Sequence, residues 1–374
     1  MKHLKSYFLL NGFGSLWIKL FSGLRVLRYA TVKKVVNFCR ATLEMYLKRE
    51  VVGSFPFRCY IEPTNLCNLR CPFCANITRP QRESKGCMSF SLFKKIIDEI
   101  SLYTFIVHLY NQGESLLHQE LAKLIRYAHS KKIATHLSTN LSIKLTEQTA
   151  TDILSSGLDF LIVCLEALDQ ETYEKYRKGG KIDVVKANIR LLNQVRRKIK
   201  SKTFLSLRVF VTRKNENKLS EIRAFGKENG FDNVIFVPMI IDFSDSTAVN
   251  EWLPLNKNFW IVSEDELNSD IENKVFCKEL WNYPVFNFDG KVLPCCLVYS
   301  DKSPYGDLAR QPLKEVWNNT YYRMSRRVFG GKSISKTSDV YCVQCKGALK
   351  LFKKAKAEVS DNRMQTHDKT LVSP

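Results

Sequence analysis

The chain has 374 residues, with 58 lysines and arginines against 37 acidic residues and a net charge of +21. Hydrophobic residues make up 45% and charged residues 25%, which excludes a disordered chain, a collagen and a multi-span membrane protein. The length suits two domains, or one barrel with an appendix. Twelve cysteines are too few for a small disulfide scaffold. Without a clean signal peptide we expect a reducing, cytoplasmic compartment, where spaced cysteines bind metal or do chemistry.

A basic extension over residues 1–52 opens the chain. Residues 1–55 carry ten Lys or Arg and two acidic residues. Apolar residues then recur at helical spacing, which predicts an amphipathic helix; they are Val32, Val35, Val36, Cys39, Leu43, Tyr46 and Leu47. Such a helix either packs its apolar stripe on the main domain or lies peripherally on the inner membrane surface. No spanning helix is expected, because no stretch of about 18 uncharged apolar residues occurs.

The basic character of the chain also raises nucleic acid as a partner. The sequence shows no aromatic-interleaved basic patch, no recognition helix and no single-strand platform motif. We therefore do not expect nucleic acid binding. A second basic stretch begins at Lys346 and turns polar past Val359, and we expect a frayed tail over residues 351–374.

Strand-like and helix-like segments alternate in the middle of the chain, which we assign to one domain over residues 53–262. The strands are expected at Phe57–Glu62, Phe105–Tyr110, Ile133–Ser138, Asp159–Leu165, Thr203–Val211 and Asn233–Val237. The helices between them are expected near Ser89–Leu102, His118–Lys131, Thr146–Ser156, Asp183–Lys200 and Asn217–Asn229. This repeated unit predicts parallel strands in an α/β fold, a partial (β/α)6 TIM-like barrel. Ligands in such folds sit at the carboxyl ends of the strands.

The loop after the first strand carries Cys67, Cys71 and Cys74 at spacings of three and two residues. Thiolates this close together can surround one soft metal centre. A [4Fe–4S] cluster usually takes four cysteines, so three would leave one iron free to bind a small molecule. The alternative is a zinc site with a fourth ligand from elsewhere, although zinc knuckles usually pair x2 spacings.

This cysteine loop after the first strand of a six-strand barrel resembles that of the radical S-adenosylmethionine (SAM) enzymes. The resemblance covers about residues 57–238. It implies that Cys67, Cys71 and Cys74 hold a [4Fe–4S] cluster whose open iron binds the amino and carboxylate groups of SAM. The resemblance also implies that Phe73 lies near the adenine.

Further cofactor-binding residues are implied at the strand ends. Gly113 and Glu114 resemble the family segment that binds the SAM amino group, with Gln112 in place of its first glycine. Ser138, Asn140 and Glu166 resemble the polar strand ends that meet the ribose and carboxylate of SAM. Arg208 could pair with the SAM carboxylate, although a structural ion pair is the alternative.

A second cysteine set lies in a smaller region, residues 263–350. Asp289-Gly290 between two apolar runs predicts a hairpin, so Cys295 would emerge at its end. With Cys277, Cys342 and Cys345 it can make a four-thiolate site, with Cys296 as the rival to Cys295. This region resembles the SPASM domain, which implies one auxiliary [4Fe–4S] cluster. A full SPASM domain carries seven cysteines and none follows Cys345 here. A zinc ribbon is the alternative.

The resemblance implies an enzyme, a radical SAM oxidoreductase or maturase. It would reductively cleave SAM to a 5′-deoxyadenosyl radical and abstract hydrogen from its substrate. Its electron donor would be a flavodoxin or ferredoxin. We expect oxidation or crosslinking of a peptide or protein, with a sugar or lipid-linked intermediate at the membrane surface as the alternative. A non-catalytic metal–cysteine scaffold is the alternative of another class.

Overall fold

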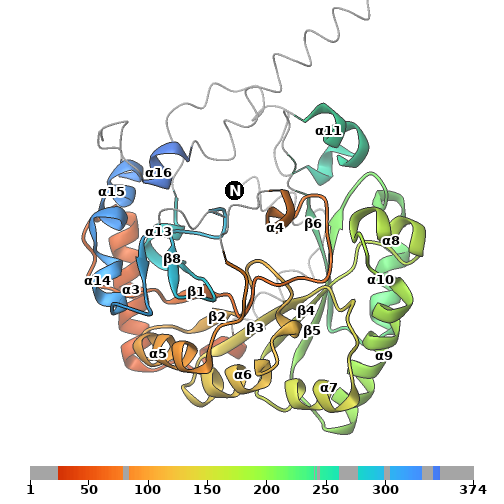
Figure 1. Cartoon of the computed structure of the whole chain (residues 1–374), viewed down its shortest axis with the longest axis horizontal. Helices are drawn as coiled ribbons and strands as arrows, with labels where there is room; N and C mark the ends of the chain where they lie inside the picture. Colours follow the sequence, from red (N-terminus) through yellow and green to blue (C-terminus); the bar gives the residue numbers. More distant parts are fainter. Residues whose placement is uncertain are drawn as a thin grey trace, which may run out of the picture.

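A computed structural model of the chain describes residues 24–78, 84–239, 241, 245–260, 277–298, 304–330 and 340–345. The described strands form one sheet in the order β6-β5-β4-β3-β2-β1-β7-β8-β9. Six parallel strands build most of it: β1 Arg58–Ile61, β2 Ile106–His108, β3 Ala134–Thr139, β4 Phe160–Cys164, β5 Phe204–Val211 and β6 Asn233–Pro238. Since β6 and β9 lie at opposite edges, the described sheet is an open, partial barrel (Figure 1).

Helices cover the outer side of this sheet, as a parallel α/β fold requires. Those between the first six strands are α4 Ala75–Thr78, α5 Phe90–Ile100, α6 Leu121–Ser130, α7 Glu147–Leu154, α8 Gln170–Tyr176, α9 Ile182–Lys198 and α10 Leu219–Glu228. Single 3-10 turns lie at Ser115–Leu117, Glu216–Lys218 and Lys257–Phe259. The six predicted strands and five predicted helices are confirmed. The short helices α4 and α8 are not among those five, because four and seven residues are too few to show a helical period.

The predicted hairpin is confirmed, and its strands join the barrel sheet. Strand β7 Val285–Phe286 pairs in parallel with β1, and β8 Lys291–Leu293 pairs antiparallel with β7. Strand β9 Gly306–Asp307 pairs antiparallel with β8 and is the edge strand on this side of the sheet. The helices of this part of the chain are α11 Ser246–Trp252, α13 Glu279–Asn282, α14 Leu313–Trp317, α15 Thr320–Phe329 and α16 Tyr341–Gln344.

Buried polar contacts fix the C-terminal region against the chain that precedes β1. The Trp317 indole donates to the Ser54 carbonyl at 3.0 Å, and the Trp281 indole donates to the Arg49 carbonyl at 2.9 Å. The guanidinium of Arg326 is fully buried and donates to backbone carbonyls on both sides. Apart from Nη2 of Arg326, which has no hydrogen-bond partner in the described structure, these buried donors are satisfied and position the C-terminal cysteines relative to the barrel.

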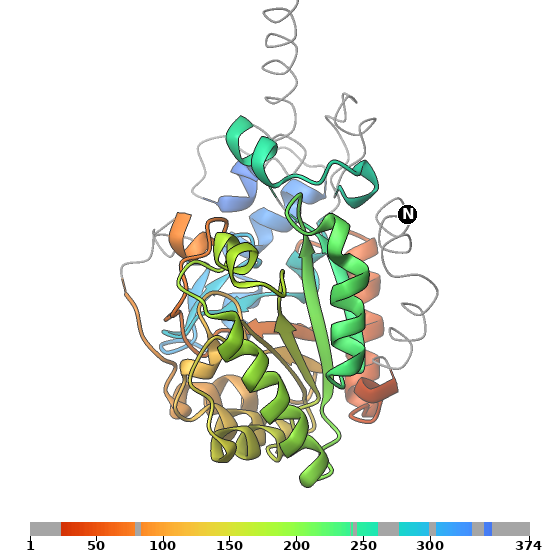
Figure 2. The ribbon, with the colours of Figure 1, turned by 90° about the vertical axis from the view of Figure 1, so that its right-hand side faces the viewer.

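The N-terminal helix is confirmed as α3 Val32–Tyr46, but packing of its apolar stripe on the main domain is not what the structure shows. Val36 is 60% exposed, Leu43 59% and Tyr46 67%. The buried face instead carries Lys34, Asn37, Ala41 and Met45. Figure 2 shows α3 along the side of the barrel.

The polar face of α3 is buried because its side chains find partners on the barrel. The Asn37 amide donates to the Phe55 carbonyl at 3.0 Å and accepts from the Phe55 amide at 2.8 Å. The Lys34 ammonium donates to the Lys132 carbonyl, and burial lowers the pKa of Lys34 to about 8. Within the described residues, no helix is long and apolar enough to cross a membrane.

Successive side chains along each strand alternate between a buried outer face of the sheet and a partly accessible inner face. The outward residues Cys59, Val107 and Leu137 are completely buried in the main core. Their inward neighbours on the same strands are mostly polar and keep part of their surface accessible; they include Tyr60, His108, Tyr110, His136 and Ser138. The barrel interior is therefore reachable by solvent, and it opens towards the loops that follow the strands.

Candidate functional site

The cysteine loop lies at the carboxyl end of β1. Cys71 is buried, Cys67 and Cys74 are partly accessible, and all three are free thiols. Burial, followed by the proximity of Glu114, Cys71 and Cys74, raises the pKa of Cys67 to about 11. The three predicted sulfur ligands are thus close enough to influence one another. Three soft donors in one partly accessible loop suit a [4Fe–4S] cluster with one iron left open.

Gly113 holds this loop against the end of β2. Its φ of +82° is in the left-handed region, and a Cβ there would lie 2.5 Å from the Thr64 carbonyl oxygen and 2.7 Å from that of Leu66. The next residue, Glu114, donates its backbone N–H to the Leu66 carbonyl at 2.7 Å. A glycine is therefore needed here for close approach as well as for backbone conformation.

The carboxylate of Glu114 is buried and bonded to backbone. It accepts from the Asn140 amide N–H at 2.7 Å and from the Leu116 N–H at 3.1 Å. Burial raises the pKa of Glu114, while these hydrogen bonds oppose the rise. Glu114 therefore joins the ends of β2 and β3 beside Cys67. Its contact with the SAM amino group stays a prediction.

Two further predicted residues lie beside the cysteine loop. The Asn140 side chain donates to Asn68 at 3.1 Å and lies 3.9 Å from the sulfur of Cys67. Glu166 forms two hydrogen bonds to the guanidinium of Arg177, at 2.6 and 2.7 Å. The same guanidinium lies 3.7 Å from the sulfur of Cys71.

Sequence reasoning missed Arg177. It follows α8, which was not predicted, and sits in a run of charged residues that resembles an ordinary solvated segment. In the structure it carries a buried positive charge next to Cys71, compensated by Glu166. A cation at this position can stabilise a cysteine thiolate or an anion that binds at the loop.

Aromatic side chains form a wall on the other side of the loop. Phe73 stacks on Tyr176 with ring centroids 6.3 Å apart and meets Trp252 edge-on at 5.5 Å. Tyr176 and Trp252 belong to a small separate hydrophobic cluster. A planar base could stack here, so the predicted place of Phe73 near an adenine is compatible with this geometry.

Two other predicted residues lie deeper in the barrel. Arg208 of β5 donates to the hydroxyl of Ser138 and to the sulfur of Cys164, both at 3.1 Å. In the described structure neither Arg208 nor Ser138 forms a hydrogen bond with the three loop cysteines. The structure therefore groups Cys67, Cys71, Cys74, Phe73, Gly113, Glu114, Asn140 and Glu166 around the loop. It places Ser138 and Arg208 beside Cys164, with Arg177 close enough to act on the charge of Arg208.

The second cysteine set gathers around Cys342. Burial raises the pKa of Cys277 to about 12, with Cys342 nearby as a further cause. Burial also raises the pKa of Cys295, to which Cys296, Cys342 and Cys277 contribute. Cys345 acts on Cys342 in the same way. The four predicted auxiliary ligands are thus neighbours in the structure.

Cys296 faces a different direction from Cys295. Burial raises its pKa, and its other influences are Glu279, Tyr60 and Arg58. Tyr60 lines the barrel interior, so Cys296 is directed to the barrel while Cys295 lies by Cys277 and Cys342. The Tyr305 hydroxyl also lies 3.5 Å from the Cys342 sulfur, where it can donate a hydrogen bond.

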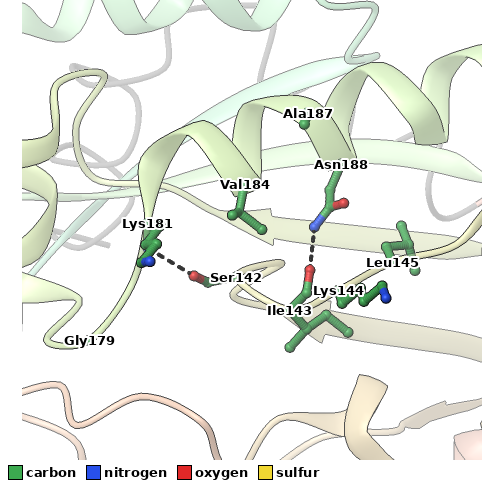
Figure 3. A pocket seen from close by; sticks show the side chains of 9 residues that line it. All are labelled: Ser142, Ile143, Lys144, Leu145, Gly179, Lys181, Val184, Ala187 and Asn188. Carbon is green, nitrogen blue, oxygen red and sulfur yellow. Dashed lines mark hydrogen bonds between the residues drawn. The ribbon is translucent and has the colours of Figure 1, made fainter.

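Two further observations limit what this site can be. Within the described ranges, no three His, Cys, Asp or Glu side chains come close enough to bind a single metal ion; the thiolates of a [4Fe–4S] cluster bind separate irons. A pocket of about 380 Å³ lies between residues 142–145 and the start of α9 (Figure 3). Asn188 donates to the Ile143 carbonyl at 2.7 Å inside it. None of the predicted site residues lines this pocket.

Family models match both parts of the chain. Residues 61–225 match the model described as the radical SAM superfamily, and residues 277–346 match the SPASM iron–sulfur cluster-binding domain. A probable GTP 3′,8-cyclase from Methanococcus maripaludis is 26% identical over 64% of this chain and 84% of its own. A PqqA peptide cyclase from Bradyrhizobium diazoefficiens is 23% identical over 31% of this chain and 30% of its own.

Solved structures share the fold at low identity. Streptococcus suis SuiB bound to its precursor peptide SuiA has a TM-score of 0.57 and 18% identity, over 82% of this chain and 73% of that chain. The enzyme anSMEcpe with bound AdoMet and the Kp18Cys peptide has a TM-score of 0.52 and 15% identity, over 82% and 99% of the two chains.

Proposed function

Since the chain is a radical SAM enzyme with a C-terminal SPASM-type iron–sulfur domain, we propose that it oxidises or crosslinks a peptide or protein substrate. When bound, the clusters supply one-electron chemistry: reductive cleavage of SAM to a 5′-deoxyadenosyl radical at the barrel, and electron transfer at the auxiliary site. The residues of the chain bind and orient these groups and determine how far apart the two cluster sites lie.

The proposed first cluster is held by Cys67, Cys71 and Cys74. Gly113 and Glu114 hold that loop in register with the ends of β2 and β3. Arg177 places a compensated positive charge beside Cys71, where it lowers the pKa of that thiol against the effect of burial. Phe73, Tyr176 and Trp252 offer an apolar wall for a base.

One observation carries the proposal of an oxidation: the turn that carries the auxiliary ligand Cys295 also reaches the barrel interior, through the next residue Cys296. Cys295 lies among Cys277 and Cys342, while its neighbour Cys296 approaches Tyr60 inside the barrel. A substrate radical formed in the barrel would therefore lie near an electron acceptor. Loss of a hydrogen atom and then of one electron and one proton removes two hydrogens from the substrate, a two-electron oxidation.

The peptide is favoured because two structural neighbours of similar fold were solved with peptides and a curated relative is a peptide cyclase. A sugar, a lipid-linked intermediate or a nucleotide is the alternative; the GTP cyclase relative supports a nucleotide. The test is anaerobic incubation of the reconstituted enzyme with SAM, dithionite and the peptides encoded beside its gene. A peptide that loses two hydrogens supports the proposal, and a product formed only from nucleotides or sugars contradicts it.

We also propose that α3 attaches the protein peripherally to an anionic membrane. Its outward face exposes Val32, Val35, Val36, Leu43, Tyr46 and Leu47, each between 45% and 82%. A contiguous apolar face of this kind on a soluble fold marks an interaction surface. Polar contacts of Lys34 and Asn37 hold the opposite face on the barrel, so the helix cannot turn this stripe inward.

The charge of this region favours a lipid surface over another copy of the chain. Residues 1–43 contain eight Lys or Arg and no Asp or Glu. Two such surfaces would repel each other, whereas an anionic surface attracts each basic residue by about 1 kcal/mol. The apolar stripe and the positive charge together are the signature of a helix that lies in the membrane interface.

Vesicle flotation of the full-length protein tests this attachment. We expect it to float with vesicles that contain about 30% phosphatidylglycerol and not with phosphatidylcholine alone, and to be released by salt, because the Debye length shortens. The double change Val36→Glu and Leu43→Glu should abolish flotation. Leu255→Glu is the matched control, since Leu255 is 70% exposed and lies elsewhere.

Three results would contradict membrane attachment. The first is flotation of the double variant equal to that of the unchanged protein. The second is a lower melting temperature of the double variant without any flotation by the unchanged protein, which would show that the chain itself covers this face. The third is a dimer, seen by light scattering, that the double variant converts to monomer.

A further inference from the structure

The interior of the barrel has an unusual lining for a parallel sheet. In barrels whose interior serves only packing, branched aliphatic residues fill the inward positions. Here most of those positions on the first three strands carry polar side chains that stay partly accessible, among them Arg58, Tyr60, His108, His136 and Ser138, with Ile106 as an aliphatic exception. The interior is therefore made for contact with a polar ligand or with water.

Rings that touch across five strands form the floor of this interior. The centroid distances are 5.0 Å for Tyr60–His108, 5.0 Å for His108–His136, 5.3 Å for His136–Phe160 and 6.0 Å for Phe160–Phe204. Burial lowers the pKa of both histidines, that of His136 to about 3. The floor is thus aromatic and uncharged at neutral pH.

Arg208 brings a positive charge to this interior. Its side-chain hydrogen bonds go to two neutral groups, Ser138 and Cys164, and its Nε is buried with no hydrogen-bond partner in the described structure. Tyr110 is a further close neighbour. Among the described residues, no Asp or Glu forms an ion pair with it. A guanidinium is charged at every physiological pH, so this charge lacks an anion.

The other buried guanidinium of the barrel shows the contrast. Arg177 has both hydrogen bonds to Glu166 and reaches Cys71 at the cysteine loop. Among the described residues Arg208 has no carboxylate partner, and its hydrogen bonds go to Ser138 and Cys164 instead. Because burying an unpaired charge is costly, an arginine in this place indicates that a ligand supplies the missing anion.

We propose that Arg208 binds an anionic group of the substrate, a carboxylate or a phosphate, inside the barrel. Ser138 positions the guanidinium through Nη2, which leaves the N–H groups of Nε and Nη1 as donors for the ligand. This inference rests on the proposed function for the existence of a substrate in the barrel. It replaces the expectation that Arg208 pairs with the carboxylate of SAM.

Thermal unfolding with anion probes tests the site without any turnover. The probes are inorganic phosphate and N-acetylglutamate amide, each against sodium chloride at matched ionic strength. We expect one probe to raise the melting temperature of the unchanged protein, because a ligand that binds the native state stabilises it. Arg208→Gln should remove that shift. Arg223→Gln, on the outer helix α10, loses the same charge and should keep it.

The outcome identifies the kind of substrate. A shift with phosphate alone indicates a nucleotide or sugar phosphate, and a shift with the carboxylate alone indicates an acidic residue of a peptide. SAM affinity, measured by equilibrium dialysis, should change by less than about twofold in Arg208→Gln, equivalent to under about 0.4 kcal/mol. Formation of 5′-deoxyadenosine without substrate should also persist, so failure here leaves the radical chemistry itself untouched.

Two results would overturn the inference. One is an equal response of the unchanged protein and Arg208→Gln to both anions. The other is a loss of SAM affinity of about tenfold or more in Arg208→Gln. That loss would show that Arg208 binds the carboxylate of SAM instead of the substrate. Should Arg208→Gln fail to fold, Arg208→Lys keeps the charge and must retain a weaker shift, because lysine cannot reproduce the planar fork.

Discussion

Changing Cys67, Cys71 and Cys74 together to alanine is expected to reduce SAM cleavage to the background rate, while the auxiliary site keeps its iron. The three thiols are neighbours in one loop at the end of β1. Their alanine variants remove all three sulfur donors of this loop. The measurement is 5′-deoxyadenosine formed under dithionite, beside the iron content of the purified variant.

A matched control separates the loss of a ligand from the loss of a thiol. Cys39 is a free, exposed cysteine on α3, so Cys39→Ala should leave both the iron content and SAM cleavage unchanged. Production of 5′-deoxyadenosine by the triple variant at the rate of the unchanged protein would contradict the assignment of these three ligands.

The second large effect is expected at the auxiliary site. Cys295→Ala, or the pair Cys342→Ala and Cys345→Ala, should lower the iron content from about eight to about four per chain. Cys296→Ala is the matched control, since Cys296 is the next residue and faces Tyr60 inside the barrel instead. It should retain about eight irons.

The reverse pattern would show that Cys296 is the ligand. Equal loss in both variants would mean that the turn after β8 collapses without either side chain, and this would contradict the assignment. Retention of the first cluster in every auxiliary variant is also required. The two sites use separate segments, the loop after β1 and the residues near α13, β8 and α16.

The sequence was sufficient for the barrel because local pattern and tertiary structure agree there. Each predicted strand is a short apolar run whose outward residues form the core, as with Val107 and Leu137. Gly157 and Gly230 follow the helices α7 and α10 and have φ values of +88° and +71°, a left-handed conformation that glycine adopts at little cost. The cysteine loop was equally readable, since its three members lie within eight residues of one another.

The orientation of α3 could not be predicted from its period. An apolar stripe ordinarily marks the buried face. Here Lys34 and Asn37 find backbone partners on the barrel, at Lys132 and Phe55, and these contacts decide which side is buried. Such partners are distant in sequence, and a period carries no information about them.

The same limit applies to the pairing of charges inside the barrel. Arg177 and Glu166 are eleven residues apart, and only the fold shows that they form two hydrogen bonds beside Cys71. Arg208 stood out in an apolar strand, but its lack of a carboxylate partner among the described residues emerges only from the structure. The choice between the adjacent Cys295 and Cys296 as the auxiliary ligand likewise depends on the neighbours of each side chain, which only the structure shows.

Mössbauer spectroscopy of the anaerobically prepared, full-length protein tests the central claim most directly. The account predicts about eight irons per chain in two [4Fe–4S] clusters, of which one changes its spectrum when SAM is added, because a single iron lacks a cysteine ligand. A colourless protein with zinc in place of iron would contradict it. A count of about twelve irons in three clusters would also contradict it, as would two clusters whose Mössbauer spectra both stay unchanged when SAM is added.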